Sequence, residues 1–216
     1  MEKSSISKPT LQRLPVYLNY LHSLPESVKM TSATQVALAL GLNEVQVRKD
    51  LSIASRCGGK PKTGYSVRQL AEDLEEFLGY HHPKEAVLIG VGKLGSALLS
   101  FKGFQQLGMK ISCAFDNDPE KIGTEVNHIP IYHIQDMKKI CPERQIQIGI
   151  LTTSPEPAQE LCRLMLESGI LAIWNFSTAL LNVPENIIVH NENLAVSLAM
   201  ISYQLDEQQK KEDTSC

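Results

Sequence analysis

Three glycines that follow an apolar run are the residues of this sequence best suited to binding a phosphate-containing ligand. Gly90, Gly92 and Gly95 form the pattern G-x-G-x-x-G directly after the strand-like segment EAVLIG. A turn of this kind lets the backbone approach a pyrophosphate and points the N-terminus of the next helix at its negative charge. Asp116 ends the following apolar run, KISCAFD, where a carboxylate is placed to bind the adenosine ribose. The pattern predicts an NAD(H) site, because the charge of Asp116 disfavours the 2′-phosphate of NADP(H).

Strand and helix patterns alternate after this turn. We expect helices over residues 93–107, 135–140 and 156–169, and strands over the segments IPIYH, IQIGILTT, LAIWNFS and NIIVH. This order is typical of a mostly parallel, Rossmann-like sheet whose ligand lies at the carboxyl edge. Thr152 and Thr153 fall at that edge. A sheet of this type that binds no nucleotide is the alternative interpretation.

The segment before the glycine turn has the pattern of a helix-turn-helix. Leucines at steps of three and four predict a first amphipathic helix over residues 7–24. A second helix, capped by Thr31 or Ser32, ends at Gly41, and Asn43 caps a third. The third helix would face solvent or a DNA groove. An ordinary helical hairpin is the alternative interpretation.

A glycine-rich and lysine-rich turn, SRCGGKPKTGYSV, follows the third helix. It suits a β-wing, in which basic side chains approach phosphates. Together with the helix-turn-helix, this turn predicts a winged helix. The predicted DNA-binding residues are Gln46, Arg48, Lys49, Ser52, Arg56, Lys60, Lys62 and Tyr65.

Charge is distributed unevenly along the chain. The net charge of the 216 residues is −3, but through Arg68 ten basic residues stand against four acidic ones, and in the remainder eleven stand against twenty. A basic front half is typical of a module that binds a polyanion. The charge pattern therefore supports the DNA-binding interpretation without establishing it.

Several other classes of function are disfavoured. Five cysteines without C-x-x-C spacing argue against a disulfide framework and a zinc site. No apolar run approaches the roughly 20 residues that span a bilayer, so we expect a cytoplasmic protein that binds no membrane and no metal. His128, His133 and His190 lack a carboxylate pattern for acid–base work, so we expect no catalytic residues. A CoA-binding or nucleotide-binding enzyme subunit stays as an alternative, which tight binding of double-stranded DNA would reject.

The C-terminal segment NENLAVSLAMISYQLDEQ predicts a helix with an apolar stripe. Leu194, Leu198, Ile201 and Leu205 lie on one face, which suits either closure of its own domain or a partner helix. A DNA-reading protein gains from two-fold symmetry. We therefore expect a winged-helix DNA-binding domain over 1–82, a Rossmann-like domain over 83–192 and a dimerisation helix with a polar tail over 193–216.

From about Lys8 to Leu205 the chain resembles the Rex redox-sensing transcriptional repressors of bacteria. The most specific segments are TLQRLPVYLNYL, QVRKDLS, GVGKLGSALLSFKGF, AFDNDPEKIG and NVPENIIVHNENL. The resemblance implies a homodimer that binds operator DNA through winged helices and leaves it when NADH replaces NAD+. The implied fold is α/β, with an N-terminal winged helix-turn-helix, a Rossmann-like parallel sheet and a C-terminal helix swapped onto the partner subunit.

The resemblance also completes the set of predicted site residues. In the family an arginine, matched here by Arg13, belongs to a polar interdomain relay beside the nicotinamide. The predicted cofactor contacts are Gly90, Val91, Gly92, Lys93, Leu94, Gly95, Phe101, Asp116, Asn117, Lys121, Thr152, Thr153 and Asn193.

The sequence departs from the family pattern at positions that bear on sensing. Where the family reads GAGNLG, this chain has GVGKLG, which places Lys93 near the pyrophosphate, and its wing is one residue longer. The relay tyrosine and aspartate are Phe101 and Asn193 here, so only Arg13 remains. We interpret the chain as an NAD(H)-responsive repressor. The alternative is a regulator with weakened redox discrimination that holds NAD(H) structurally.

Overall fold

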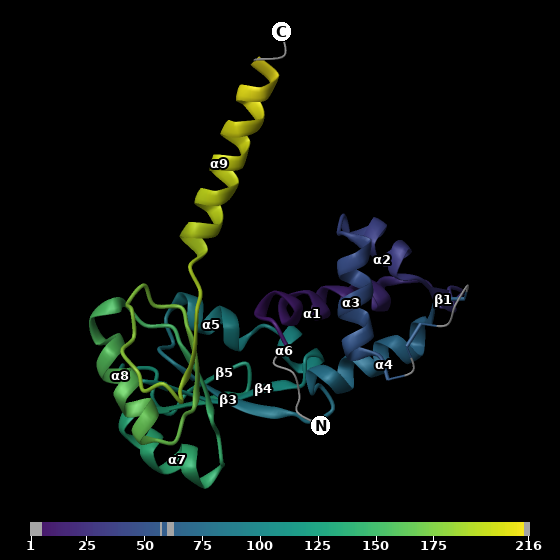
Figure 1. The fold of residues 1–216 in the computed structure, drawn as a ribbon. Coiled ribbons are helices and arrows are strands. Elements are labelled where there is room, and N and C mark those ends of the chain that lie inside the picture. The colour runs from purple at the N-terminus through teal and green to yellow at the C-terminus, as the bar shows by residue number, and fades with distance from the viewer. Residues whose placement is uncertain (1–5, 57, 60–62, 214–216) are drawn as a thin grey trace. The chain divides into compact units, whose positions relative to one another are not determined.

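The computed structural model describes residues 6–56, 58–59 and 63–213. The chain divides into two compact units, Met1–Pro83 and Lys84–Cys216 (Figure 1). The last helix is grouped with the second unit, and a separate C-terminal segment from residue 193 stays a prediction.

The N-terminal unit contains the predicted helix-turn-helix. Ser32 forms a capping box with Gln35 at the start of the second helix, Gly41 adopts the left-handed conformation with φ 64° at its end, and Asn43 caps the third. These local hydrogen bonds satisfy backbone groups that a helix leaves unpaired at its ends. The elements are α1 (Lys8–Ser23), β1 (Met30–Thr31), α2 (Ala33–Leu40), α3 (Glu44–Ala54), β2 (Tyr65–Ser66) and α4 (Val67–Leu78).

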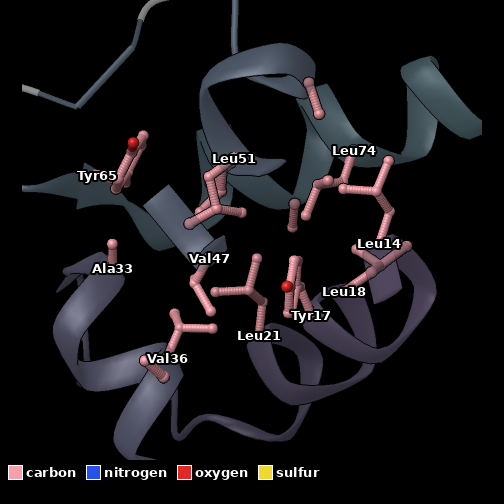
Figure 2. Close-up of a cluster of buried hydrophobic side chains, with 14 residues drawn as sticks. Leu14, Tyr17, Leu18, Leu21, Ala33, Val36, Val47, Leu51, Tyr65 and Leu74 are labelled. Carbon is pink, nitrogen blue, oxygen red and sulfur yellow. The ribbon is translucent and has the colours of Figure 1, made fainter. Parts of the chain in front are cut away.

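One apolar core holds the N-terminal unit together. Figure 2 shows Tyr17 and Leu21 of α1 and Val47 and Leu51 of α3 turned toward one another, and all four are buried. Strands β1 and β2 pair antiparallel, which joins the start of the helix-turn-helix to the end of the wing segment. The inner face of α3 is packed into this core, and its outer face is exposed.

The second unit is a seven-stranded sheet with helices, in the order β5-β6-β4-β3-β7-β8-β9 among the described residues. All neighbouring strands are parallel except β5 and β6. The elements are β3 (Lys84–Ile89), α5 (Lys93–Leu99), α6 (Gly103–Gln106), β4 (Met109–Asp116), β5 (Glu125–Val126), β6 (Ile129–His133), a 3-10 turn (Ile134–Asp136), α7 (Met137–Glu143), β7 (Ile148–Leu151), α8 (Pro155–Glu167), β8 (Ala172–Asn175), β9 (Ile188–Asn191) and α9 (Leu194–Asp213).

The strand order creates a ligand-binding position. From β3 the chain builds the sheet outward through β4 and β6, and then returns to place β7 on the other side of β3. In doubly wound sheets ligands bind at the carboxyl ends of the strands where the order reverses, which is here between β3 and β7. The predicted Rossmann-like parallel sheet is confirmed.

Two apolar layers cover the sheet. Met137 and Cys141 of α7 and Met165 of α8 pack on one face, against Val87 and Ile89 of β3. Leu99 of α5 packs on the opposite face, against Ala86 and Leu88. Alternate residues of β3 therefore face opposite helices, and both faces are buried, as a parallel sheet requires.

The helix predicted over residues 93–107 is wrong in its length. It is interrupted after Leu99, and α6 begins only at Gly103. The Ser100 hydroxyl donates to the Ser96 carbonyl, and the Phe101 ring lies so close to Gly103 that a β-carbon there would be 2.5 Å from it. The apolar spacing continues through the break, which is why periodicity alone missed it.

The described cysteines are interior residues rather than reactive ones. Cys113, Cys141 and Cys162 are free and buried. Burial raises the pKa of Cys113 to about 12 and that of Cys141 to about 11. Thiols that stay protonated are poor nucleophiles and poor metal ligands.

Helix α9 exposes an apolar surface. Leu194, Leu198 and Ile201 are each more than half exposed, as is Leu205. Exposed apolar patches of this extent mark interaction surfaces. Within the described residues, every helix is too short or too polar to cross a membrane.

Candidate functional site

The glycine turn after β3 is shaped by close approaches that admit no side chain. A β-carbon at Gly95 would lie 2.2 Å from the Gly90 carbonyl oxygen, and one at Gly90 would lie 2.6 Å from the Thr153 methyl group. Gly90 also has φ +95°, which only glycine adopts readily. A β-carbon added at Gly92 would meet no other atom within 4 Å among the described residues, so the space beside this residue at the N-terminus of α5 is open.

Two threonines after β7 line the same turn. The Thr152 hydroxyl lies 2.7 Å from the Gly90 carbonyl oxygen and 3.0 Å from the Ile89 carbonyl oxygen, and its single hydrogen is shared between these two acceptors. The Thr153 hydroxyl is buried and has no hydrogen-bond partner among the described residues. A buried polar atom without a partner is costly unless a ligand or water satisfies it. Its position beside Gly90 indicates a polar ligand at this edge.

Asp116 closes the turn from the end of β4. One carboxylate oxygen accepts from the Val91 backbone N–H at 2.7 Å, and the other from the Asp118 N–H at 2.9 Å. The Lys121 ammonium lies 3.1 Å from Asp118 and 3.5 Å from Asp116. Its hydrogen bond to Asp118, followed by the charge of Asp116, raises the pKa of Lys121. Asp116 therefore holds the turn and stays partly accessible to a ligand.

The turn fits a pyrophosphate-containing dinucleotide. It combines a helix N-terminus facing open space, an unpaired hydroxyl and a carboxylate at the ribose position. Lys93, Leu94 and Asn117 are exposed beside it. The structure thus brings together the predicted contacts from Gly90 to Gly95 with Asp116, Lys121, Thr152 and Thr153.

Phe101 and Asn193 have local packing roles in the structure. The Phe101 ring is 58% exposed and meets Phe104 edge-on, with ring centroids 5.0 Å apart. The Asn193 amide oxygen accepts from the Val196 N–H at 3.1 Å and so caps α9. Contact of either residue with a cofactor stays a prediction.

The exposed face of α3 carries the predicted DNA-binding side chains. Gln46, Arg48, Lys49 and Ser52 are all exposed. Arg48 pairs with Glu44 one turn earlier, and the Ser52 hydroxyl donates to the Lys49 carbonyl. An open hollow of about 840 Å³ separates this face from the start of α2 and the segment before β2. The hollow is lined by polar residues, among them Ser32, Gln35, Arg48, Ser52 and Thr63, and by apolar ones such as Met30 and Tyr65.

The described wing residues differ in their exposure. Tyr65 is only 9% exposed, and its ring lies against Gly59 and belongs to the apolar core of the unit. Its contact with DNA stays a prediction. Arg56 is exposed but lies 3.8 Å from Asp73 and 3.7 Å from Glu76 of α4. Lys60 and Lys62 lie outside the described residues.

A buried polar cluster behind α3 was not predicted from the sequence. Asp50, 3% exposed, accepts hydrogen bonds from Thr10 at 3.1 Å, from Tyr17 at 2.8 Å and from Arg13 at 2.7 and 3.0 Å. All three donors lie on α1. An aspartate three residues after buried Val47 lies on the inner face of the helix, and this spacing was the available signal.

Arg13 therefore has its described partners inside its own unit. Burial disfavours ionisation of Asp50, but the bonds from Arg13, Tyr17 and Thr10 outweigh it and lower the pKa of Asp50. Burial and the same carboxylate raise the pKa of Tyr17 to about 12. The part of Arg13 in an interdomain relay stays a prediction, whereas its pairing with Asp50 is the observed interaction. Among the described residues, no group of three histidines, cysteines or acidic residues is placed to hold a metal.

Fold and site together define a two-unit protein with a helix-turn-helix and a dinucleotide-type sheet. A family model described as "Putative DNA-binding protein N-terminus" matches residues 5–52, and one described as "CoA binding domain" matches residues 81–179. A "Redox-sensing transcriptional repressor Rex" of Bacteroides thetaiotaomicron is 40% identical over 204 residues, 94% of this chain and 92% of the relative. That of Treponema denticola is 38% identical over 92% of this chain and 94% of the relative.

The fold of this chain also matches solved structures of a Rex-family repressor. RSP, a Rex-family repressor, has a TM-score of 0.87 and 29% identity, and the match covers 99% of this chain and 100% of that one. RSP structures with β-NADH and with β-NAD+ and operator DNA each have a TM-score of 0.87 and 30% identity, and cover 98% and 99% of this chain. The chain belongs to the Rex family of redox-sensing transcriptional repressors. The alternative of an enzyme subunit is therefore set aside.

Replacing Arg13 by methionine should destabilise the N-terminal unit by about 3 kcal/mol or more, because it leaves the Asp50 carboxylate buried without its cation. Since the pKa of Asp50 in the folded protein lies below its ordinary 3.8, the stabilisation is complete above that value and is lost as pH falls through the folded pKa. Hydrogen exchange of α1 and α3 peptides at pH 7 measures the effect.

Arg68→Met is the matched control, because its partner Glu72 is on the surface and its own side chain is 90% exposed. Such a pair contributes about 1 kcal/mol or less. Equal protection of α3 in the two variants would contradict the role given to Arg13.

Proposed function

We propose that this chain is an NAD(H)-responsive repressor that binds operator DNA through α3 and the wing, and leaves it when NADH binds. The observation that carries the proposal is that one chain joins an exposed helix-turn-helix face to a glycine turn open at Gly92 and closed by Asp116. Either part alone occurs in many proteins.

The glycine turn supplies the cofactor part of the proposal. The N–H groups at the start of α5 would receive the pyrophosphate, Thr153 would gain a partner for its hydroxyl, and Asp116 would bind the ribose hydroxyls. When bound, the cofactor supplies a nicotinamide ring whose positive charge is lost on reduction. The chain's own residues convert that change into a preference for one arrangement of its two units.

The exposed face of α3 supplies the DNA part. Lys49 is free of ion pairs in the described structure, so its ammonium is available to a phosphate or a base edge. The hollow beside α3 is open, and Arg48 and Ser52 are among its lining residues, so a charged backbone placed there would meet a cation and a hydroxyl. RSP in complex with operator DNA supports extending this activity to the present chain.

Helix α9 supplies the proposed dimer contact. Its exposed leucines and isoleucine need a partner, and the swapped helix expected from the family resemblance offers one. A two-fold dimer reads two half-sites of an operator. We place the homodimer in the cytoplasm, where NAD(H) and DNA are both accessible to a bacterial regulator.

Titration of an operator fragment with this protein in gel shifts tests the function. The fragment–protein complex should form in the presence of NAD+ and dissociate as NADH is added, because the two cofactors favour different arrangements of the units. A random fragment of equal length and composition is the control. Failure to retain the operator over the random fragment would overturn the DNA-binding proposal.

Cofactor choice should follow the charge of Asp116. NADH should bind at least tenfold more tightly than NADPH, since a 2′-phosphate would meet the carboxylate, and Asp116→Ala should reduce that preference. Calorimetric titration of both cofactors measures the ratio. Asp118→Ala, which leaves Asp116 in place, is the control. Equal affinities for the two cofactors in the unsubstituted protein would contradict the assignment of Asp116.

A second candidate is a Rex-family regulator whose discrimination between NAD+ and NADH is compressed. Phe101 and Asn193 favour it, because neither side chain carries the hydroxyl or the charge of the relay expected from the family pattern. Two unit charges about 4 Å apart interact by about 4 kcal/mol at an effective dielectric constant of 20. Loss of one carboxylate beside the nicotinamide therefore changes the response strongly.

The double substitution Phe101→Tyr with Asn193→Asp should widen the ratio of DNA affinities measured with NAD+ and with NADH. Both changes suit the packing: a tyrosine keeps the ring against Phe104, and an aspartate caps α9 as well as an asparagine does. Paired operator titrations of the two proteins measure the ratio. A strong NADH response that the double substitution leaves unchanged would show that neither position takes part in sensing.

A further inference from the structure

The amide of Gln46 lies where α3 would meet base edges. Gln46 is exposed in the first turn of this helix, and the N-terminal residues of a recognition helix are those that contact bases in helix-turn-helix proteins. A glutamine amide has an acceptor and a donor, so its orientation decides which bases it reads. The interpretation rests on the proposed DNA-binding function.

Arg13 lies against that amide with its guanidinium already fixed. Nε and Nη2 donate to the two oxygens of Asp50 at 2.7 and 3.0 Å. With the amide oxygen of Gln46 facing it, the other edge of the same guanidinium donates to that oxygen from Nη1 at 3.2 Å and from Nη2 at 3.0 Å. A planar guanidinium offers donors on both edges and no acceptor.

Contact with Arg13 favours one orientation of the Gln46 amide. The opposite orientation would place the amide NH2 against the guanidinium N–H groups, donor against donor. The guanidinium cannot turn to relieve this clash without breaking its bonds to Asp50, which is buried and has no other cation within the described contacts. When the amide contacts Arg13, its oxygen therefore faces the guanidinium and its NH2 group points away from it.

We propose that Arg13 is a positioning residue that fixes Gln46 as a donor and so sets the base it reads. In the major groove guanine presents two acceptors, N7 and O6, whereas adenine presents an acceptor beside a donor. A glutamine reads adenine by using its oxygen and its NH2 together, and here the oxygen is occupied by Arg13. Gln46 consequently selects guanine over adenine at one position of each half-site.

Selection of bound duplexes from a library randomised over one half-site, followed by sequencing, tests the proposal in the full-length protein with NAD+. Gln46→Leu should lose selectivity at a single position, and that position should carry guanine for the unsubstituted protein. Replacing that guanine by adenine should weaken binding about tenfold or more. Gln12→Leu, at another exposed glutamine of the same unit, is the matched control and should leave the profile unchanged.

Two further variants separate positioning from folding. Arg13→Met frees the amide to turn, so the penalty for adenine at that position should shrink while the rest of the profile stays. Gln46→Glu keeps an acceptor against Arg13 and offers no outward donor, so selection should move from guanine to cytosine, whose N4 donates. If Arg13→Met does not fold, the Gln46→Glu profile decides.

Selection of adenine by the unsubstituted protein at the Gln46-dependent position, or an unchanged profile in Gln46→Leu, overturns the inference and leaves the repressor function standing. Failure of the unsubstituted protein to retain any duplex overturns the proposed function and the inference with it.

Discussion

A carboxylate inside a protein must be surrounded by donors, and in the N-terminal unit this requirement fixes how α3 is held. Asp50 has almost no exposure, and Thr10, Arg13 and Tyr17 of α1 supply its hydrogen bonds. A buried ion pair often adds little net stability compared with apolar residues, but it tolerates few alternative arrangements. The hydrogen bonds between Asp50 and α1 therefore fix how α3 is placed along α1. This placement also decides which residues of α3 face outward.

The second unit uses a carboxylate in a different way. The oxygens of Asp116 accept from the backbone at Val91 and Asp118, and Lys121 is nearby. Its partners are backbone groups of a turn that also needs Gly95 to pass close to the Gly90 carbonyl. Asp50 is enclosed by side chains and acts only through its neighbours, whereas Asp116 holds the turn and still faces the ligand edge.

Local chemistry was visible in the sequence, and contacts between distant segments were not. Ser32, Gly41 and Asn43 act on backbone groups within a few residues, so the helix boundaries they set were predictable. The partners of Asp50 lie 33 to 40 residues away, and nothing local identifies them. The packing of the Tyr65 ring against Gly59 was likewise not predictable, because it depends on the folded chain.

The departures at Phe101 and Asn193 separate packing from sensing. The Asn193 side chain caps α9 through an oxygen that aspartate also has, so the helix start does not require the charge. The Phe101 ring packs against Phe104 and remains more than half exposed, so the fold does not require a hydroxyl there. These local contacts therefore do not require phenylalanine at position 101 or asparagine at position 193. A hydroxyl or a charge at these positions would add nothing to the contacts that hold α6 and α9, so its effect would be on the response to the cofactor.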